Sequence, residues 1–191
     1  MFTGIVEGMG IVRKIDCKKN LMTMSISAPK ILKGAKPGDS VCFQGVCLTV
    51  TMIQKSLLSF DIMKETIDKT SLKYLKPFDK VNLERSLTPR SRFDGHFVTG
   101  HIDDVGKVSK KIQHPNYLEL QISIPRRLRK YVIPKGSVGV DGVSLTVGPV
   151  RGNCFSIFLI PYTIENTTLG ILKAGDPVNI ETDILAKYCL Q

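Results

Sequence analysis

The sequence predicts an all-β protein made of two similar barrel domains. Short apolar runs rich in Val, Ile, Phe and Thr alternate with turns that contain Gly, Pro and Asp. The phrase GVCLTV at 45–50 returns as GVSLTV at 142–147, with Cys47 replaced by Ser144. The proportions of 42% hydrophobic and 23% charged residues are those of a folded globular protein. A chain of 191 residues can therefore form two domains that each bury a core.

An internal repeat covers most of the chain. Gly4 lies over Gly100 at a spacing of 96, and Thr49 lies over Thr146 at a spacing of 97. The change of spacing requires one extra residue in the second copy. Such extensive self-similarity predicts two homologous domains related by duplication.

The boundary between the copies is expected near residue 92. The stretch SLTPRSRFDGH at 86–96 contains Pro89, two arginines and an Asp-Gly pair, which interrupt the apolar pattern. We therefore expect an N-terminal domain over 1–92 and a C-terminal domain over 93–183. The remaining short segment, 184–191, is expected to begin a helix.

Each copy contains five apolar runs whose brevity and spacing are typical of strands in a small barrel or sandwich. In the first copy they are 10–15, 21–27, 40–50, 56–63 and 80–84. The segments 65–75 and 163–172 have helical spacing but are barely long enough for three turns, so we expect short helices that plug an end. A closed barrel of about six strands removes unpaired edges. Periodicity alone does not separate it from two sandwiches.

The charge balance and the cysteine content limit the classes of function that the chain can have. Lys and Arg number 27 against 17 Asp and Glu, a net charge of +10, which raises the question of a nucleic-acid-binding barrel. The basic patch at 126–130 lacks the interleaved aromatic residues that base stacking needs, so a solvated face is favoured. Five scattered cysteines and three histidines fit neither a disulfide framework nor a zinc site. We expect no metal, no cofactor, no nucleic acid, no membrane span and a cytoplasmic location.

The repeated phrase has two faces. On a strand Cys47 and Thr49 share one face, and Leu48 and Val50 share the other and are expected to face the core. Several hydroxyls and carboxylates follow an apolar strand end in FDIMKETIDKTSL at 60–72 and in FLIPYTIENTTL at 158–169, where the mouth of a barrel would gather them. A flat heteroaromatic ligand with a polyhydroxylated tail suits such a site. The alternative is a well-packed hairpin retained in both copies.

The phrases MFTGIVEG, GVCLTV, FDIMKET, TGHID and DGVSLTVG follow one another between Met1 and Asp183. In this order they resemble riboflavin synthase of the α-chain, lumazine-binding-repeat type. The resemblance implies two six-stranded Greek-key barrels, each binding one 6,7-dimethyl-8-ribityllumazine. It implies transfer of a four-carbon unit between the two lumazines, which gives riboflavin and 5-amino-6-(D-ribitylamino)uracil. It also implies a homotrimer with active sites between subunits, and association with lumazine synthase.

The resemblance also implies site residues. The residues implied to take part in catalysis are Phe2, Ser40, Cys47, His101, Ser144, Thr146 and Asp183. The N-terminal binding site comprises Gly4, Ile5, Val6, Cys47, Leu48, Thr49, Asp61, Ile62, Met63, Lys64, Glu65 and Thr66. The C-terminal site comprises Gly100, His101, Ile102, Lys135, Ser144, Leu145, Thr146, Ile160, Pro161, Tyr162, Thr163, Ile164 and Glu165.

Some of these residues have structural alternatives. Cys47 alone would be a small core residue, Asp183 would cap the final helix, and Phe2 would pin the chain start. Glu65 of the first copy is replaced by Tyr162 in the second, so the second site is expected to hold a ribityl tail differently. The short end after Asp183 is expected to weaken a trimer. The strongest rival is a lumazine-binding antenna protein without catalysis, and a second rival, from another class, is a basic β-barrel that binds single-stranded nucleic acid.

Overall fold

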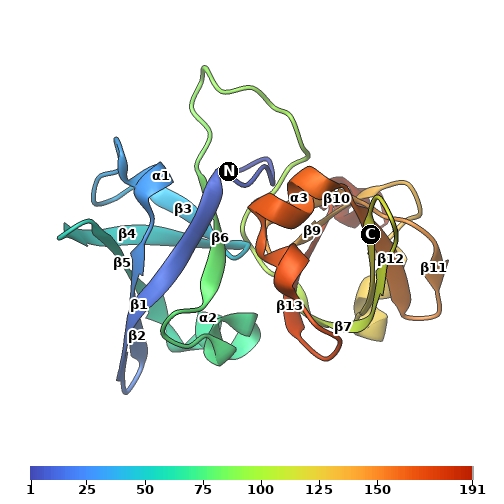
Figure 1. The fold of residues 1–191 in the computed structure, drawn as a ribbon, viewed down its shortest axis with the longest axis horizontal. Coiled ribbons are helices and arrows are strands. Elements are labelled where there is room, and N and C mark those ends of the chain that lie inside the picture. Colours follow the sequence, from blue (N-terminus) through green and yellow to red (C-terminus); the bar gives the residue numbers. More distant parts are fainter. Residues whose placement is uncertain (191) are drawn as a thin grey trace.

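The computed structural model describes residues 1–190 and consists of two all-β domains joined by one long connection (Figure 1). The first domain is a closed barrel with the strand order β1-β2-β5-β4-β3-β6. Its strands are β1 (Gly8–Lys18), β2 (Leu21–Ser27), β3 (Ser40–Phe43), β4 (Val46–Gln54), β5 (Leu57–Met63) and β6 (Lys80–Arg85). The predicted fold class and the duplication are confirmed.

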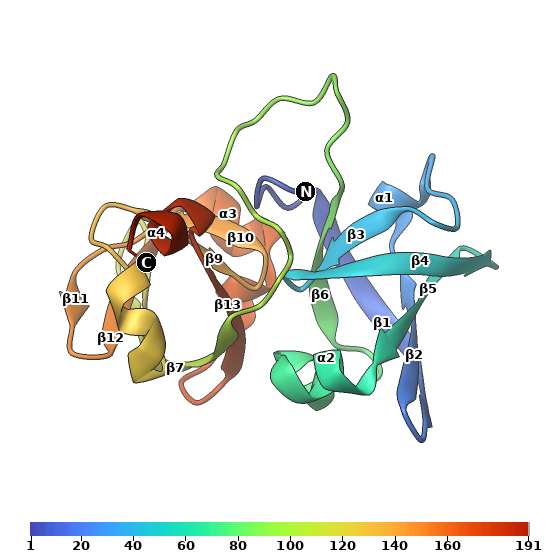
Figure 2. The same cartoon turned by 180° about the vertical axis from the view of Figure 1, so that it is seen from behind.

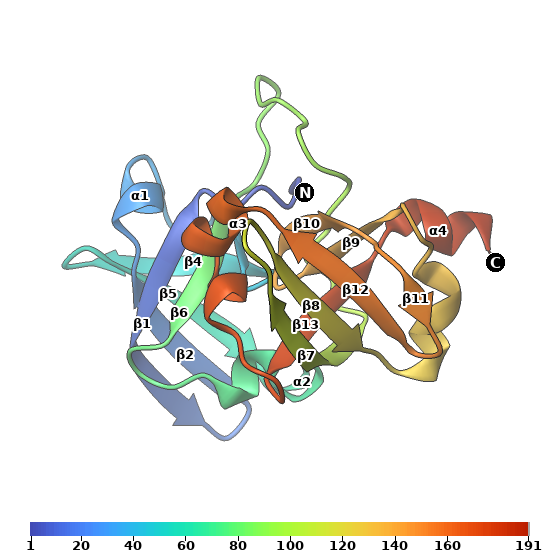
Figure 3. The ribbon, with the colours of Figure 1, turned by 45° about the vertical axis from the view of Figure 1, so that its right-hand side comes forward.

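The second domain repeats this order with one strand divided in two, and its seven strands form a curled sheet that is not closed into a barrel. Its sheet runs β10-β9-β13-β7-β8-β12-β11, and its face is visible in Figure 3. The strands are β7 (Asp104–Gln113), β8 (Leu118–Ser123), β9 (Ser137–Val140), β10 (Val143–Thr146), β11 (Val150–Arg151), β12 (Cys154–Leu159) and β13 (Pro177–Thr182). β10 and β11 together occupy the place that β4 has in the first domain.

A proline explains the divided strand. In the first domain β4 passes a bulge between Val50 and Met52 and continues to pair with β5. Pro149 takes the place of Met52 in the second copy. Because proline has no N–H to donate to the ladder, the strand stops before it and resumes as β11.

A threonine shapes the helical segment of each copy. α2 (Lys64–Lys69) is followed by the 3-10 turn η1 (Ser71–Tyr74), and α3 (Pro161–Asn166) is followed by η3 (Thr168–Ile171). Between them Thr70 or Thr167 donates its hydroxyl to a carbonyl four residues back, at 2.7 Å in both copies. The same oxygen accepts from the N–H two residues ahead and starts the tighter turn.

Three further helical segments complete the chain. They are α1 (Pro29–Leu32), η2 (Arg126–Tyr131) and α4 (Ile184–Cys189). α4 and η2 lie together at the outer end of the second domain (Figure 2). The expected helix at 184–191 is therefore present over 184–189, and Gln191 lies outside the described residues. No helix within residues 1–190 has the length and apolar character to cross a membrane.

Each domain has its own apolar core, built by the alternation along the strands. In β4, Leu48 is 7% and Val50 1% exposed, and both pack in the first core. Cys47 is half-buried and Thr49 exposed on the opposite face. This is the division of faces that the sequence predicts.

Two tight turns join the domains. Gln44 and Asp141 have φ of +50° and +48°, and each precedes a glycine in the turn that links its two hairpin strands. Asn82 donates to the Asp141 carbonyl at 3.0 Å, and Asn179 donates to the Gln44 carbonyl at 2.8 Å. All four side chains are buried. The interface thus repeats itself about a local twofold axis, and the connection that contains residue 92 loops over it (Figure 1).

Candidate functional site

The two copies of the repeated phrase are each completed by a segment of the other domain. The N–H of Cys47 donates to the carbonyl of Gly100 at 2.9 Å, and the N–H of Ser144 donates to the carbonyl of Gly4 at 2.8 Å. Both glycines have positive φ, +78° at Gly4 and +80° at Gly100. A Cβ on either would lie 2.6 Å from the Cβ of the residue it docks against. Glycine is therefore required at both positions by backbone conformation and by close approach.

Buried carboxylates hold these docking segments. Glu84 accepts from the N–H groups of Thr3 and Gly4 at 2.7 and 2.9 Å. Glu181 accepts from Thr99 and Gly100 in the same way, at 2.6 and 3.0 Å. Burial raises the pKa of both glutamates, and the hydrogen bonds oppose the rise. The recurrence of VNLE at 81–84 and VNIE at 178–181 could have indicated a shared role for Glu84 and Glu181. The sequence-based prediction of the site did not include these two glutamates.

The first cavity is composite. Cys47, Glu65 and Thr66 of the first domain line it, together with the segment 100–102 of the second, and its volume is about 200 Å³. The sequence-based grouping assigned 100–102 to the Ser144 site, and this grouping is wrong. The reason is the exchange of docking segments, which places each segment against the other copy of the phrase.

The residues predicted at 61–65 differ in their exposure, and of these Glu65 lines the cavity. Glu65 forms an ion pair with Lys69 at 2.6 Å, and hydrogen bonding to that lysine lowers the pKa of Glu65. Asp61 accepts from Thr23 at 2.7 Å on the outer face of the barrel. Ile62 is buried in the core, so only its backbone is available to a ligand. Met63 and Lys64 are exposed.

Ser144 has a different environment. His96 Nδ1 lies 2.6 Å from Ser144 Oγ. The imidazole is 7% exposed, and its Nε2 is buried without a hydrogen-bond partner among the described residues. Burial lowers the pKa of His96, while the charge of Asp183 opposes this shift. The ring is therefore neutral near pH 7 and able to hold the serine hydroxyl in a fixed direction.

His96 was missed by the sequence-based prediction. Its equivalent in the first copy would precede Met1, so the repeat gave no signal for it. Gly4 reaches Ser144 from the first domain. Val6 packs against the core of the second domain, and Ile5 is exposed. The predicted grouping of 4–6 with Cys47 is corrected in the same way.

The remaining predicted residues of the second site lie on α3 and nearby strands. Ile160 and Tyr162 are 61% and 72% exposed, whereas Leu145 and Ile164 pack against the second core. Pro161 begins α3. The members not yet placed are Ile102, which packs against the first core, the half-buried Thr163, and the exposed Thr146 and Glu165.

Phe2, Ser40 and Asp183 take no part in the two backbone hydrogen bonds that the repeated phrase makes to the other domain. Phe2 is fully buried, forms a bridge to Val98 and packs with Cys42 and Cys47. Ser40 lines a larger cavity, of about 610 Å³, beside the connecting loop. Asp183 caps α4 by accepting from the N–H of Leu185 at 3.0 Å.

Lys135 stands out by its backbone. Its φ is +67°, and its N–H donates to the carbonyl of Val147 at 2.8 Å. The equivalent residue of the first copy is Gly38, whose N–H makes the same bond to Val50. A lysine in a position that suits glycine is a local strain of the kind that accumulates at functional sites.

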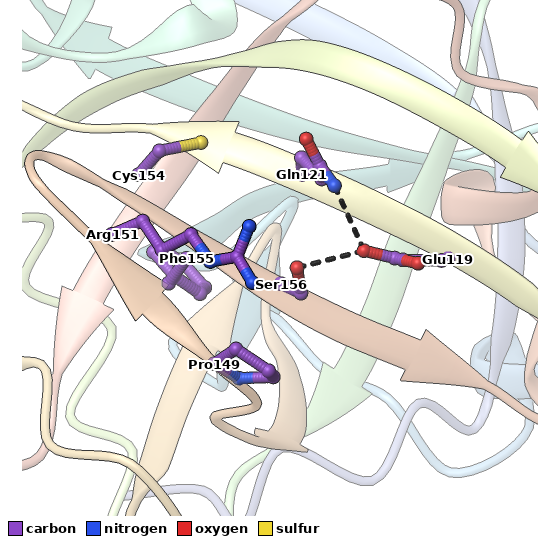
Figure 4. Close-up of a pocket in the computed structure, with 7 residues that line it drawn as sticks. All are labelled: Glu119, Gln121, Pro149, Arg151, Cys154, Phe155 and Ser156. Atoms are coloured by element: carbon purple, nitrogen blue, oxygen red, sulfur yellow. Dashed lines mark hydrogen bonds between the residues drawn. The ribbon is translucent and has the colours of Figure 1, made fainter.

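A further pocket lies on the outer face of the second domain and contains none of the predicted residues (Figure 4). There Glu119 accepts from Gln121 and Ser156 at 3.0 and 2.8 Å, which lowers its pKa. Within residues 1–190 no cluster of three or more His, Cys, Asp or Glu side chains is arranged to hold a metal ion.

Comparison with known proteins gives a consistent result. A family model described as "Lumazine binding domain" matches residues 3–86 and 99–183. A riboflavin synthase of Actinobacillus pleuropneumoniae is 40% identical over 191 residues, which is 100% of this chain and 89% of the relative. A riboflavin synthase of Escherichia coli is 43% identical over 185 residues, with 96% and 87% coverage.

Solved structures show the same arrangement of elements. LumP complexed with riboflavin superposes with a TM-score of 0.90 at 31% identity, covering 95% of this chain and 99% of that chain. LumP complexed with 6,7-dimethyl-8-(1'-D-ribityl) lumazine gives a TM-score of 0.88 at the same identity and coverage.

Proposed function

This chain belongs to the riboflavin synthase family of enzymes, and we propose that it converts two 6,7-dimethyl-8-ribityllumazine molecules into riboflavin and 5-amino-6-(D-ribitylamino)uracil. The single observation that carries the proposal is the pair of equivalent docking contacts, Cys47 to Gly100 and Ser144 to Gly4. A reaction between two copies of one molecule requires two similar sites. Holding both substrates in a fixed orientation removes much of the entropic part of the barrier.

The two sites are proposed to differ in their reactive groups. The first presents the thiol of Cys47 with His101 on the segment that docks beside it. The second presents the hydroxyl of Ser144, which His96 holds at 2.6 Å. Two unlike sites allow one lumazine to give the four-carbon unit and the other to receive it. His101 is the group we assign to proton transfer, because histidine is the side chain best matched to acid-base work near neutral pH.

The remaining catalytic assignments follow the family resemblance. Thr146 is proposed to hold the second substrate from the outer face of β10. Ser40 is proposed to act on the first, since it pairs with Thr49 across β3 and β4. Phe2 is proposed to hold Cys47 in place by packing against it, and Asp183 is proposed to face His96.

We propose a homotrimer that works in the cytoplasm and associates with lumazine synthase. An apolar groove between η2 and α4 supports the oligomer. Ile133, Leu185 and Leu190 line it and are 47%, 56% and 42% exposed. Large apolar side chains gathered in this way are typical of an interface.

The test is turnover. The purified protein is incubated with 6,7-dimethyl-8-ribityllumazine while riboflavin is followed by absorbance and by chromatography. We expect riboflavin and the uracil product to accumulate in equal amounts. Binding of the lumazine with no product would contradict the proposal.

A lumazine-binding antenna is the second candidate, favoured by the likeness to LumP bound to riboflavin. Such a protein needs ligand affinity and no catalytic groups. Cys47, His101 and Thr146 favour the enzyme, because an antenna has no use for a thiol, an imidazole and a hydroxyl beside the ligand. Tight fluorescent binding without turnover would select the antenna.

A further inference from the structure

Two cysteines face each other across the hairpin of the first domain. Cys42 in β3 and Cys47 in β4 are directly opposite partners. Both lie on the outer face of the barrel and belong to one small cluster with Phe2 and Val98. Both thiols are free in this structure.

The pair is of the type in which the strands approach most closely. The N–H of Cys47 donates to Gly100 at 2.9 Å and therefore points away from Cys42. Opposite residues that do not exchange backbone hydrogen bonds have Cα atoms about 4.5 Å apart. That separation lies inside the range of roughly 4.4–6.8 Å found for disulfides.

The two thiols differ in accessibility. Cys47 is half-buried and lines the first cavity, so it is open to small solutes. Cys42 is 2% exposed. Burial, together with the nearby carboxylates of Glu84 and Glu181, raises the pKa of Cys42 well above its ordinary value. Cys47 is therefore the first to meet an oxidant, and Cys42 the second to react.

We propose that Cys42 and Cys47 form a disulfide under oxidising conditions and that this modification removes the Cys47 thiol from the cavity. The oxidant is a small disulfide such as oxidised glutathione. The Cys47 thiolate attacks one sulfur of it, forms a mixed disulfide and releases one glutathione thiolate. Cys42 then loses its proton to solvent and attacks the Cys47 sulfur, which expels the second glutathione thiolate. Two protein thiols are oxidised, and one glutathione disulfide is reduced to two thiols.

Only one of the two sites carries this pair. The equivalent partners in the second domain are Gly139 and Ser144. Oxidation would therefore disable the Cys47 site and leave the Ser144 site unchanged. This consequence for activity rests on the proposed function, whereas the disulfide itself does not.

The test measures the thiols directly. The folded protein and its Cys42→Ala variant are incubated with oxidised glutathione, alkylated, and digested with a protease that cleaves after Phe43. Alanine suits position 42 because the equivalent position holds Gly139. In the unsubstituted protein we expect the two fragments to stay joined and to lack the mass of two hydrogen atoms. In the variant we expect a stable mixed disulfide on Cys47.

Other results overturn either the disulfide or its effect on the cavity. A mixed disulfide that persists on Cys47 in the unsubstituted protein, or a bond from Cys47 to Cys154, would show that Cys42 does not resolve it. Lumazine binding is measured in parallel, with reduction by dithiothreitol to restore it. If the disulfide forms and the affinity for the lumazine is unchanged, the proposed effect of the disulfide on the cavity is refuted. If the reduced protein never turns over, the proposed function fails and the mapped disulfide stands.

Discussion

The backbone of Cys47 donates a hydrogen bond to the carbonyl of Gly100, a residue of the other domain, at 2.9 Å. Neither half of the molecule can complete this cavity by itself, because 100–102 and Cys47 lie on different sides of the connecting loop. The mirrored contact between Ser144 and Gly4 makes the second site dependent on the first domain in the same manner.

Gly100→Ala tests this contact. The new Cβ would lie 2.6 Å from Cys47 Cβ, so the docking segment must move. We expect a loss of stability of about 2 kcal/mol or more, together with weaker lumazine binding. Gly34→Ala is the control, since it has a similar φ of +85° and no atom within 4 Å. Equal losses from both variants in urea unfolding would mean that docking contributes nothing beyond backbone strain.

Lys135→Gly separates strain from function. Glycine relieves the positive φ at this position, and we expect a gain of about 0.5–1 kcal/mol with weaker ligand binding. The control is Phe78→Gly, because Phe78 has φ of +76° at the position where the second copy has Gly175. Both variants should raise the melting temperature. Calorimetric titration with the lumazine should distinguish them, and unchanged affinity in Lys135→Gly would remove Lys135 from the site.

Asp141→Asn tests the buried turn between the domains. Asp141 is 1% exposed, its Oδ2 has no hydrogen-bond partner among the described residues, and burial raises its pKa from 3.8 to about 7. The folded state therefore keeps a proton that the unfolded state releases. The contribution to stability is fully present below pH 3.8 and is lost as the pH rises towards 7, by roughly 4 kcal/mol in all.

Asparagine cannot lose a proton, so the advantage of Asp141→Asn should grow between pH 5 and pH 8. Urea unfolding of both proteins at these two pH values gives the comparison. Glu84 and Glu181 also have raised pKa values, but they are present in both proteins and cancel in the difference. A difference independent of pH would show that Asp141 is ionised throughout.

Cys47→Ser introduces the residue that the second copy has at this position. We expect turnover to fall about tenfold or more while lumazine affinity stays within about threefold, because serine retains the shape and loses the thiol. Cys154→Ser, on the outer face of the second domain, should change neither quantity. Parallel losses of affinity and rate in Cys47→Ser would assign Cys47 to binding alone.

Much of the fold follows from local pattern. Strand alternation explains why Leu48 and Val50 are buried while Thr49 is exposed. The internal repeat predicted two similar domains. The exchange of docking segments was not predictable in this way. Gly4 and Gly100 are equivalent in the sequence whether each docks on its own copy or on the other. Only the three-dimensional arrangement decides between these possibilities.

Two further features were missed for different reasons. Pro149 was visible in the sequence, but its effect depends on the partner strand that it cannot pair with. His96 lies outside the repeated region, so the repeat gave no indication of its contact with Ser144. Contacts between segments distant in the chain thus account for most of what sequence alone did not provide.

The back-to-back turns of Gln44 and Asp141 have an evolutionary consequence. In a dimer of identical chains every mutation appears twice, so the halves can never diverge from one another. Once the halves are fused in a single polypeptide, selection acts on each separately. A glutamine can then face an aspartate, and a thiol can stand where its twin has a hydroxyl. In this chain Gln44 does face Asp141, and Cys47 stands at the position where the second copy has Ser144.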